Sequence, residues 1–243
     1  MHSESDFTET PDGLGLMVKV DAARPLGELT VLVNSACDRA EGNPEKGAVI
    51  LELGATPVDH REWPGEVNIR AVTRWERAVR RLERLDTLNI AVAHGNCGGP
   101  ALELLLAADF RVGAPDLQLT PPVNDGHVWP GMLLYRLVQH LGLARARQVC
   151  MRGTGIPLRQ ACELGLVDEV CGDVPAAVRA GTALLERVSG RETAVRRLLL
   201  LEAATTEYDE ALGAHLAACD RELRRLSLGR AALASELTGK ATG

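Results

Sequence analysis

Residues 90–109, IAVAHGNCGGPALELLLAAD, decide the fold of this chain. An apolar run typical of a strand enters a turn that contains Gly95, Gly98 and Gly99, and a helix is predicted from Pro100 onward. The first N–H groups of a helix have no intrahelical partner and lie at the positive end of the helix dipole, so they bind negative charge. The turn therefore predicts a site for a developing anion.

One carboxylate, Glu103, follows on the same predicted helix among apolar neighbours. It lies three residues after Pro100 and four after Gly99, which places it on the helix face that meets the turn. A carboxylate beside an anion-binding turn is typical of enolate or oxyanion chemistry, in which the carboxylate moves a proton. The alternative is a tight strand-to-helix turn followed by a core helix with one solvated glutamate.

The segments around this stretch alternate between strand and helix. The sequence predicts strands at the alternating residues Leu14, Leu16, Val18 and Val20 and over 48–53 and 88–93, and helices over 26–41 and 67–85. The chain after residue 131 is predicted to be mostly helical, with two helices between 191 and 226 that break near Thr205. Repeated strand–helix units indicate a layered α/β domain.

Composition limits the class of protein. The 243 residues fit one large α/β domain, and with 46% hydrophobic but only 3% aromatic residues the core must consist mainly of Leu, Val and Ala. A net charge of −6 without a basic stripe argues against nucleic acid as the main partner. No apolar run approaches the roughly 18 residues of a membrane-spanning helix, so no membrane association is expected.

The cysteines and the N-terminal residues indicate a reduced compartment. Six cysteines are scattered without CxxC spacing, so we expect no metal or redox site. Reduced thiols are typical of the cytoplasm, and we therefore expect a cytoplasmic location. Cys97 lies in the glycine turn, and we expect it to be a buried thiol. The alternative is a catalytic nucleophile with His94 as its base. Residues 1–12 are polar and acidic, lack the features of a signal peptide and are predicted to form a disordered leader.

The glycine turn and the chain after it resemble one protein superfamily. HGNCGGPALEL…AD is similar to the NGxxxGGGxEL…CD segment of the crotonase (enoyl-CoA hydratase/isomerase) superfamily, and WPGMLLYRL…GLVDEV resembles its downstream IPG…RL…GLV…V pattern. The resemblance implies an α/β fold, the crotonase (ClpP-like) spiral of ββα units over residues 13–190, with a C-terminal helical trimerisation region over 191–228. We expect residues 229–243 to form a frayed tail.

The resemblance also implies roles for individual residues. Glu103 would be the general acid–base, and the turn at Gly98 and Gly99 would stabilise a thioester enolate. The substrate would be a coenzyme A thioester, and no other cofactor and no metal would be needed, because the thioester itself acidifies the α-proton. Cytoplasmic homo-oligomers, trimers or hexamers, are expected.

Pro100 is the first departure from the family pattern. It falls on the family glycine whose amide is one of the two oxyanion donors, and proline has no N–H. Loss of one such donor typically costs about 10²- to 10³-fold in rate. Either Gly99 or Ala101 supplies a shifted donor, or the oxyanion hole is weakened. A proline in the first helical turn also simply stabilises a helix start.

Val123 is the second departure, because it stands seven residues before Pro130, where the family has its second catalytic glutamate. Simple hydration, which needs both carboxylates, is therefore not expected, whereas isomerisation or dehydration with one carboxylate stays open. Asp125 and His127 in TPPVNDGHVWPG are candidates to replace the lost group. Asn-Asp-Gly is, however, also an ordinary turn sequence.

The third departure is GATPVDHREWPG at residues 54–65, which replaces the family's A-x-G-A-D turn. The second oxyanion donor is expected to be an amide between Thr56 and His60. Asp59 and His60 are candidate acid–base groups, with a solvated loop as the favoured alternative.

A narrower resemblance covers nearly the whole chain. CGGPALELLLAADFR and ATTEYDEALGAHLAACDRELRR resemble crotonase-like accessory proteins of 3,5-dihydroxyphenylglycine biosynthesis, a step of glycopeptide antibiotic formation. This resemblance implies dehydration or enolisation of a polyketide thioester toward 3,5-dihydroxyphenylacetyl-CoA. The expected partners are the acyl-CoA substrate, a type III polyketide synthase and related crotonases of the pathway. A catalytically weak scaffold that stimulates the synthase by binding it is the alternative.

Overall fold

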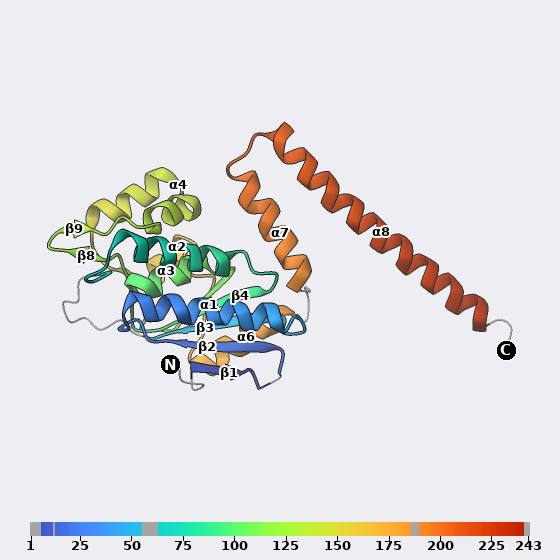
Figure 1. The fold of residues 1–243 in the computed structure, drawn as a ribbon, viewed down its shortest axis with the longest axis horizontal. Helices are drawn as coiled ribbons and strands as arrows, with labels where there is room; N and C mark the ends of the chain where they lie inside the picture. The colour runs from blue at the N-terminus through green and yellow to red at the C-terminus, as the bar shows by residue number, and fades with distance from the viewer. Residues whose placement is uncertain (1–5, 12, 55–62, 186–189, 241–243) are drawn as a thin grey trace. The chain divides into compact units, whose positions relative to one another are not determined.

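The computed structural model describes residues 6–11, 13–54, 63–185 and 190–240. The backbone divides into two compact units, Met1–Ala194 and Val195–Gly243. The first unit contains the glycine turn and Glu103, and the second contains most of the C-terminal helical region (Figure 1).

A six-stranded sheet forms the centre of the first unit. Its strands, in spatial order, are β1 (Phe7–Glu9), β2 (Gly15–Val20), β3 (Ala48–Leu53), β4 (Leu88–Ala93), β6 (Phe110–Gly113) and β11 (Glu169–Val170). β1 runs antiparallel to β2, and the other neighbours are parallel. The predicted bounds of the strands at 48–53 and 88–93 are confirmed.

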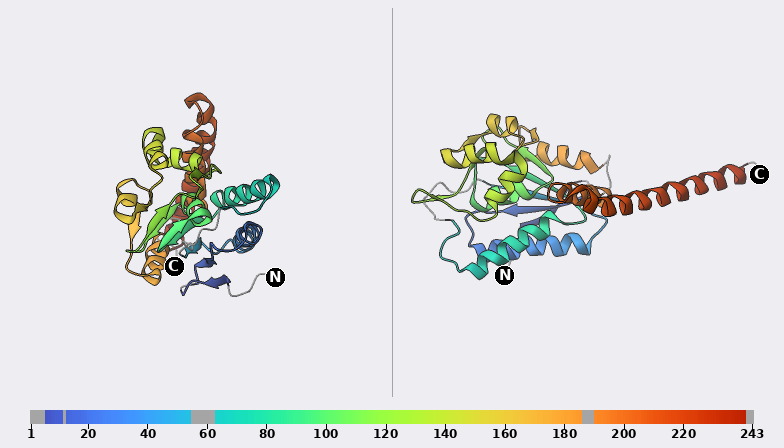
Figure 2. Two further views of the ribbon diagram at one scale, coloured as in Figure 1. Left: turned by 90° about the vertical axis from the view of Figure 1, so that its left-hand side faces the viewer. Right: turned by 90° about the horizontal axis from the view of Figure 1, so that it is seen from above.

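Helices cover both faces of this sheet, which is why β4 is buried at every position and apolar at every position except Asn89. On one face lies α1 (Leu26–Gly42), with α2 (Ile69–Glu83) packed against it, and α6 (Val174–Leu185) lies on the other face (Figure 2). α2 begins after Asn68, whose side chain accepts a hydrogen bond from the Ala71 N–H at 3.0 Å. The buried residues Trp75, Ala78, Val79 and Leu82 recur at helical spacing and direct α2 toward the core.

The chain that follows β4 builds the region around Glu103. A second sheet has the order β10 (Ile156–Pro157), β7 (Gln118–Thr120) and β5 (Asn96–Gly98), and β8 (Val123–Asn124) pairs with β9 (His127–Val128) in a hairpin. The helices of this region are α3 (Gly99–Ala107), α4 (Leu133–Arg152) and α5 (Leu158–Glu163). Every residue of α3 is buried, and α3 packs against both α2 and α4.

The predicted disordered leader is wrong for residues 6–9. Phe7–Glu9 forms β1, which pairs with β2. The strand is held by side chains that lie far from it in the sequence. Both carboxylate oxygens of Asp6 accept hydrogen bonds at 2.8 Å from Arg24, and the Arg39 guanidinium lies 4.3 Å from the centre of the Phe7 ring. Polar composition alone could not reveal these non-local contacts.

The C-terminal helices are α7 (Gly190–Ala203) and α8 (Tyr208–Lys240). The predicted break near Thr205 is confirmed. α8 continues through Lys240, so the described part of the predicted frayed tail is helical, and its fraying stays a prediction. Its last part, RAALASELTGK, is rich in strong helix formers and contains no proline.

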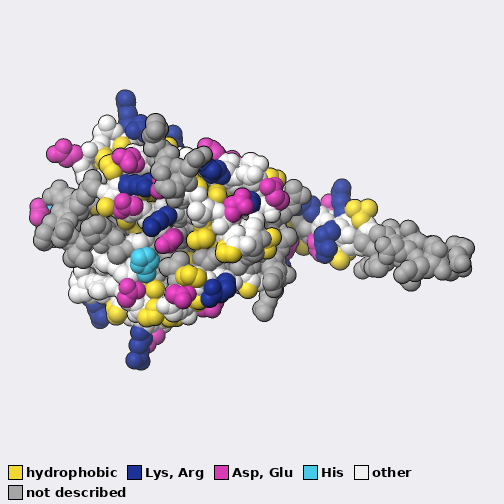
Figure 3. All heavy atoms as spheres, turned by 90° about the horizontal axis from the view of Figure 1, so that it is seen from below, with side chains coloured by type: hydrophobic (Ala, Val, Ile, Leu, Met, Phe, Trp, Pro, Cys, Tyr) yellow, Lys and Arg dark blue, Asp and Glu magenta, His cyan; other side chains and the backbone are white. Residues whose placement is uncertain are grey.

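The surface of the described residues is mixed in charge. On the face in Figure 3, acidic and basic side chains alternate rather than segregate, unlike the basic surface expected of a nucleic-acid-binding domain. Among the helices of the described segments, none is long and apolar enough to cross a membrane.

Candidate active site

The glycine turn lies where β4 ends at its carboxyl edge. Gly95 and Gly99 have φ angles of +61° and +49°, a region that glycine adopts without the strain other residues incur. A Cβ on Gly98 would lie 3.0 Å from the Thr120 carbonyl oxygen, so the close approach of β5 to β7 also requires glycine. Gly98 caps α3, and Pro100 stands in its first turn. The predicted helix start at this turn is confirmed.

Glu103 is completely buried, with 0% of the residue exposed. Its Oε2 accepts a hydrogen bond from the indole N–H of Trp75 on α2. Its Oε1 is buried without a hydrogen-bond partner among the residues that the structure describes. The alternative of a solvated glutamate is therefore wrong, and one carboxyl oxygen is left for another group.

The surroundings of Glu103 bring its pKa close to neutrality. Burial raises the pKa from its ordinary value of 4.5 to about 7, and the negative charge of Glu76 adds to this effect. The Trp75 N–H and the positive charge of Arg136 act in the opposite direction. A carboxyl with a pKa near 7 can both accept and donate a proton at physiological pH.

All three tryptophans of the chain surround this carboxyl. The rings of Trp63 and Trp75 meet edge to face, with centroids 6.1 Å apart. The Trp63 ring also packs on the glycine turn, because a Cβ on Gly99 would lie 3.4 Å from it. A Cβ on Gly131 would lie 2.8 Å from Nε1 of Trp129 and 3.1 Å from Oε1 of Glu103. The absence of a side chain at Gly131 thus keeps the space at Oε1 open.

A buried ion pair supports the site from α2 and α4. Nη1 of Arg136, a residue only 5% exposed, lies 3.3 Å from Oε2 of Glu76, and Oε1 of Glu76 accepts a hydrogen bond at 3.0 Å from the Met132 N–H. The pair ties the start of α4 to α2 and sets the charge near Glu103. Sequence reasoning missed Arg136 and Glu76. The signal available was an arginine inside the apolar stretch LLYRLV.

The two candidate replacements for the second glutamate, Asp125 and His127, lie on the hairpin of β8 and β9. Asp125 (φ +46°) and His127 are both exposed, and no contact found in the described part of the chain joins either to Glu103. Their catalytic role stays a prediction. Asn124 is the hairpin residue that reaches the site: its Nδ2 donates to the Trp63 carbonyl at 2.7 Å, and its Oδ1 accepts from the Trp63 N–H at 3.2 Å. The sequence also places Asn124, beside Asp125 and His127, near the position of the lost glutamate.

The predicted oxyanion donors lie at and near the start of α3. Pro100 has no N–H to offer. Gly99 and Ala101 are buried in the first turn of α3, where N–H groups have no intrahelical partner, so a shifted donor at either position stays a prediction, with a weakened oxyanion hole as the alternative. The segment from Thr56 to His60, where the second donor was expected, and Asp59 with it, lie outside the described residues.

Cys97 is not suited to nucleophilic catalysis. Its side chain is fully buried on β5, and burial raises the pKa of the thiol to about 12. The thiolate is the reactive form, so a thiol held protonated at neutral pH is inert. The buried-thiol interpretation is confirmed.

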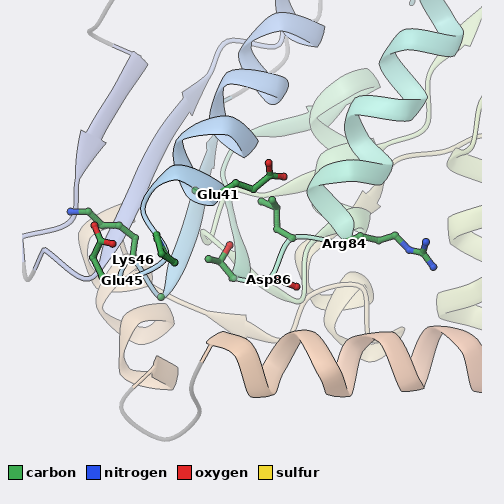
Figure 4. Close-up of a pocket in the computed structure, with 10 residues that line it drawn as sticks. Glu41, Glu45, Lys46, Arg84 and Asp86 are labelled. Carbon is green, nitrogen blue, oxygen red and sulfur yellow. The ribbon is translucent and has the colours of Figure 1, made fainter. Parts of the chain in front are cut away.

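A separate hollow of about 650 Å³ lies at the opposite edge of the sheet, beside the residues that precede β3 and β4 (Figure 4). Its charged lining comprises Glu41, Glu45, Lys46, Arg84 and Asp86. The ammonium of Lys46 already pairs with Glu9 at 2.8 Å, and Figure 4 shows the Arg84 guanidinium directed away from the acidic side chains. The net negative lining makes this hollow unsuitable for the phosphates of a nucleotide-containing ligand.

Comparison with known proteins decides the family. A family model described as enoyl-CoA hydratase/isomerase matches residues 33–221. The chain belongs to the enoyl-CoA hydratase/isomerase family. It is 47% identical over 212 residues to a protein from Amycolatopsis orientalis named enoyl-CoA-hydratase, a match that covers 86% of this chain and 96% of that protein.

Solved structures of this family show the same fold. An enoyl-CoA hydratase/isomerase from Marinobacter aquaeolei superposes with a TM-score of 0.75 at 17% identity, over 90% of this chain and 92% of the other. A Thermobifida fusca protein described as an enoyl-CoA hydratase, solved in complex with CoA, superposes with a TM-score of 0.72 at 20% identity, over 91% and 94% of the two chains. The predicted crotonase fold is confirmed.

Proposed function

We propose that this protein is a lyase or isomerase of coenzyme A thioesters in which Glu103 is the general acid–base. The proposal rests on one observation: a fully buried carboxyl with an unpartnered oxygen stands one turn into the helix that begins at the glycine turn. The pKa of about 7 supports it, because the same group can take a proton in one step and return it in the next.

The proposed chemistry needs no redox partner. The carboxylate of Glu103 removes the α-proton of the thioester, and the electrons of the C–H bond move onto the thioester oxygen as an enolate. N–H groups of the first turn of α3 stabilise that charge. When the enolate collapses, the protonated Glu103 gives the proton to a β-hydroxyl that leaves as water, or to another carbon atom. The first outcome is dehydration and the second is isomerisation.

The proposed substrate is a polyketide acyl-CoA on its way to 3,5-dihydroxyphenylacetyl-CoA, because loss of water and enolisation together produce an aromatic ring. A type III polyketide synthase would supply it, with related crotonases acting in the same pathway. The sequence resemblance supports this assignment, and the CoA bound to the Thermobifida fusca relative supports the thioester carrier.

We further propose a homo-oligomer built from trimers. The support is the row of exposed apolar residues on α8, where Leu216 and Leu223 are 57% and 66% exposed in the single chain. Light scattering at micromolar concentration should give a multiple of three chains, and a monomer alone would contradict the proposal.

A scaffold that stimulates the synthase by contact is the second candidate. It is favoured by Pro100, which removes an oxyanion donor, and by Val123, which stands where the second glutamate belongs and is 42% exposed. The burial of Glu103 favours the enzyme, because an ionisable group in a core carries a cost that a purely structural role does not require.

The two candidates are separated by Glu103→Gln, measured as aromatic product formed by the partner synthase in the presence of each variant. The substitution keeps the size of the side chain and removes the exchangeable proton. We expect the stimulation to fall by about 10²- to 10⁴-fold. The matched control is Glu163→Gln on α5, an exposed glutamate paired with Arg159, which should stimulate like the unmodified protein. Full stimulation by Glu103→Gln would establish the scaffold.

A further inference from the structure

Two buried polar atoms of the site lack a hydrogen-bond partner within the described segments: Oε1 of Glu103 and Nε1 of Trp63. The Trp63 N–H lies close enough to act on the carboxyl as a hydrogen-bond donor and to lower the pKa of Glu103, but it does not reach full hydrogen-bond geometry with either carboxyl oxygen. A donor and an acceptor therefore stand next to each other without a well-formed hydrogen bond between them. Each unsatisfied buried group costs free energy, which a suitable third group between them would recover.

The chemistry of the two atoms defines that third group. The indole N–H only donates, so the missing group must offer an acceptor oxygen or nitrogen. The ionised carboxylate only accepts, so the same group must also offer a proton. A hydroxyl is the smallest substituent of an acyl chain that does both. A methylene satisfies neither atom, and a keto oxygen satisfies both only while Glu103 is protonated.

The Trp63 indole is fixed in this position from three sides. Both backbone polar groups of Trp63 are held by the side chain of Asn124, at 2.7 and 3.2 Å. Its ring packs edge to face on Trp75, which itself bonds to Glu103, and against Gly99 at the helix start. The N–H is thus presented beside both the carboxyl and the glycine turn, where the thioester would lie.

We propose that Trp63 is a substrate-binding residue that donates its indole N–H to the oxygen of a β-hydroxyl group, so that the preferred ligands are 3-hydroxyacyl thioesters. The inference rests on the proposed function. In the dehydration step the C–O bond breaks, Glu103 gives its proton to the hydroxyl oxygen, and the bond electrons leave with that oxygen as water. Trp63 holds the oxygen throughout, a task for which Val123 offers no polar group.

The test compares the binding of 3-hydroxybutyryl-CoA and butyryl-CoA, which differ only in the β-hydroxyl, to the full chain by titration calorimetry. The unmodified protein should bind the hydroxylated ligand about five- to tenfold more tightly, the effect of one net hydrogen-bonded group. In Trp63→Phe, which keeps an aromatic ring and removes the N–H, the preference should disappear while butyryl-CoA binds as before. Tyr208→Phe, which removes a polar hydrogen from an exposed aromatic residue on α8 outside the site, should keep the preference.

The outcomes separate this inference from the proposed function. Equal affinity for the two ligands in the unmodified protein, or a preference that survives in Trp63→Phe, overturns the role of Trp63 and leaves the thioester function standing. Failure of both ligands to bind overturns the two proposals together. If Trp63→Phe does not fold, Asn124→Ala provides the test, because it releases the Trp63 backbone and should reduce the preference. An unchanged preference in Asn124→Ala would then overturn the inference.

Discussion

The indole N–H of Trp75 on α2 donates a hydrogen bond to Oε2 of Glu103 on α3, and both side chains are buried. This bond occupies one carboxyl oxygen and leaves the other directed at the space kept open by Gly131. A rotation of the carboxyl would break the bond inside the core. Trp75 is therefore a positioning residue, which selects the oxygen that is free to react.

Trp75→Phe should raise the pKa of Glu103 above about 7, because the lost N–H stabilised the ionised form. A hydrogen bond to a charged group corresponds to an upward shift of about one pH unit. The measurement is the carbon-13 titration of the Glu103 carboxyl, assigned by the loss of its signal in Glu103→Gln. A pKa that stays in place or falls would show that the bond does not act on the ionised carboxyl.

The stability of the protein should depend on pH through Glu103. The folded-state pKa of about 7 lies above the ordinary value of 4.5, so the group contributes stability below about pH 4.5 and loses this contribution as the pH rises through about 7. Glu103→Gln removes the titration. Relative to the unmodified protein, the variant should gain up to about 3 kcal/mol in the free energy of unfolding between pH 4.5 and pH 8.

Urea unfolding at the two pH values measures this difference. Glu163→Gln is the control, since an exposed glutamate should show no such gain. A Glu103→Gln variant whose relative stability is the same at both pH values would contradict the raised pKa.

Hydration of crotonyl-CoA should be negligible. By the resemblance to the family pattern, Pro100 would take the place of one oxyanion donor, and Val123 would take the place of the second carboxylate, which would hold the attacking water. The assay is the loss of enoyl absorbance, and a turnover of about one per second or more, within the range of ordinary enzymes, would contradict our assignment of these two positions. Val123→Glu restores the carboxylate and should increase hydration, although Pro100 still denies the oxyanion one donor.

Much of the fold could be predicted from sequence because its signals are local. The strands at 48–53 and 88–93 are apolar at every position except Glu52 and Asn89, and the start of α3 is marked by glycines and a proline within three residues. β1 could not be predicted, because its pairing with β2 depends on contacts such as Asp6 with Arg24 rather than on its own polar sequence.

The residues of the site also fall into those with a local sequence signal and those that only the fold brings together. Glu103 and the glycine turn could be predicted because the helix repeat relates them along one short segment. Trp63, Trp75 and Arg136 could not, since they come from segments that only the fold brings together. The two residues predicted from their nearness to the lost glutamate, Asp125 and His127, instead lie on an exposed hairpin. Of the residues close in sequence to the position of the lost glutamate, it is Asn124, which has no carboxylate, that contacts the site, through its hydrogen bond to the Trp63 carbonyl.

The central claim, that Glu103 moves the α-proton of a thioester, is tested most directly by deuterium exchange at the α-carbon of butyryl-CoA in heavy water, without any partner protein. Mass spectrometry of the recovered thioester gives the rate. We predict exchange by the unmodified protein and by Glu163→Gln, and a rate lower by about 10²-fold or more in Glu103→Gln. Equal rates in Glu103→Gln and the unmodified protein, or no exchange above the uncatalysed rate, would contradict the claim.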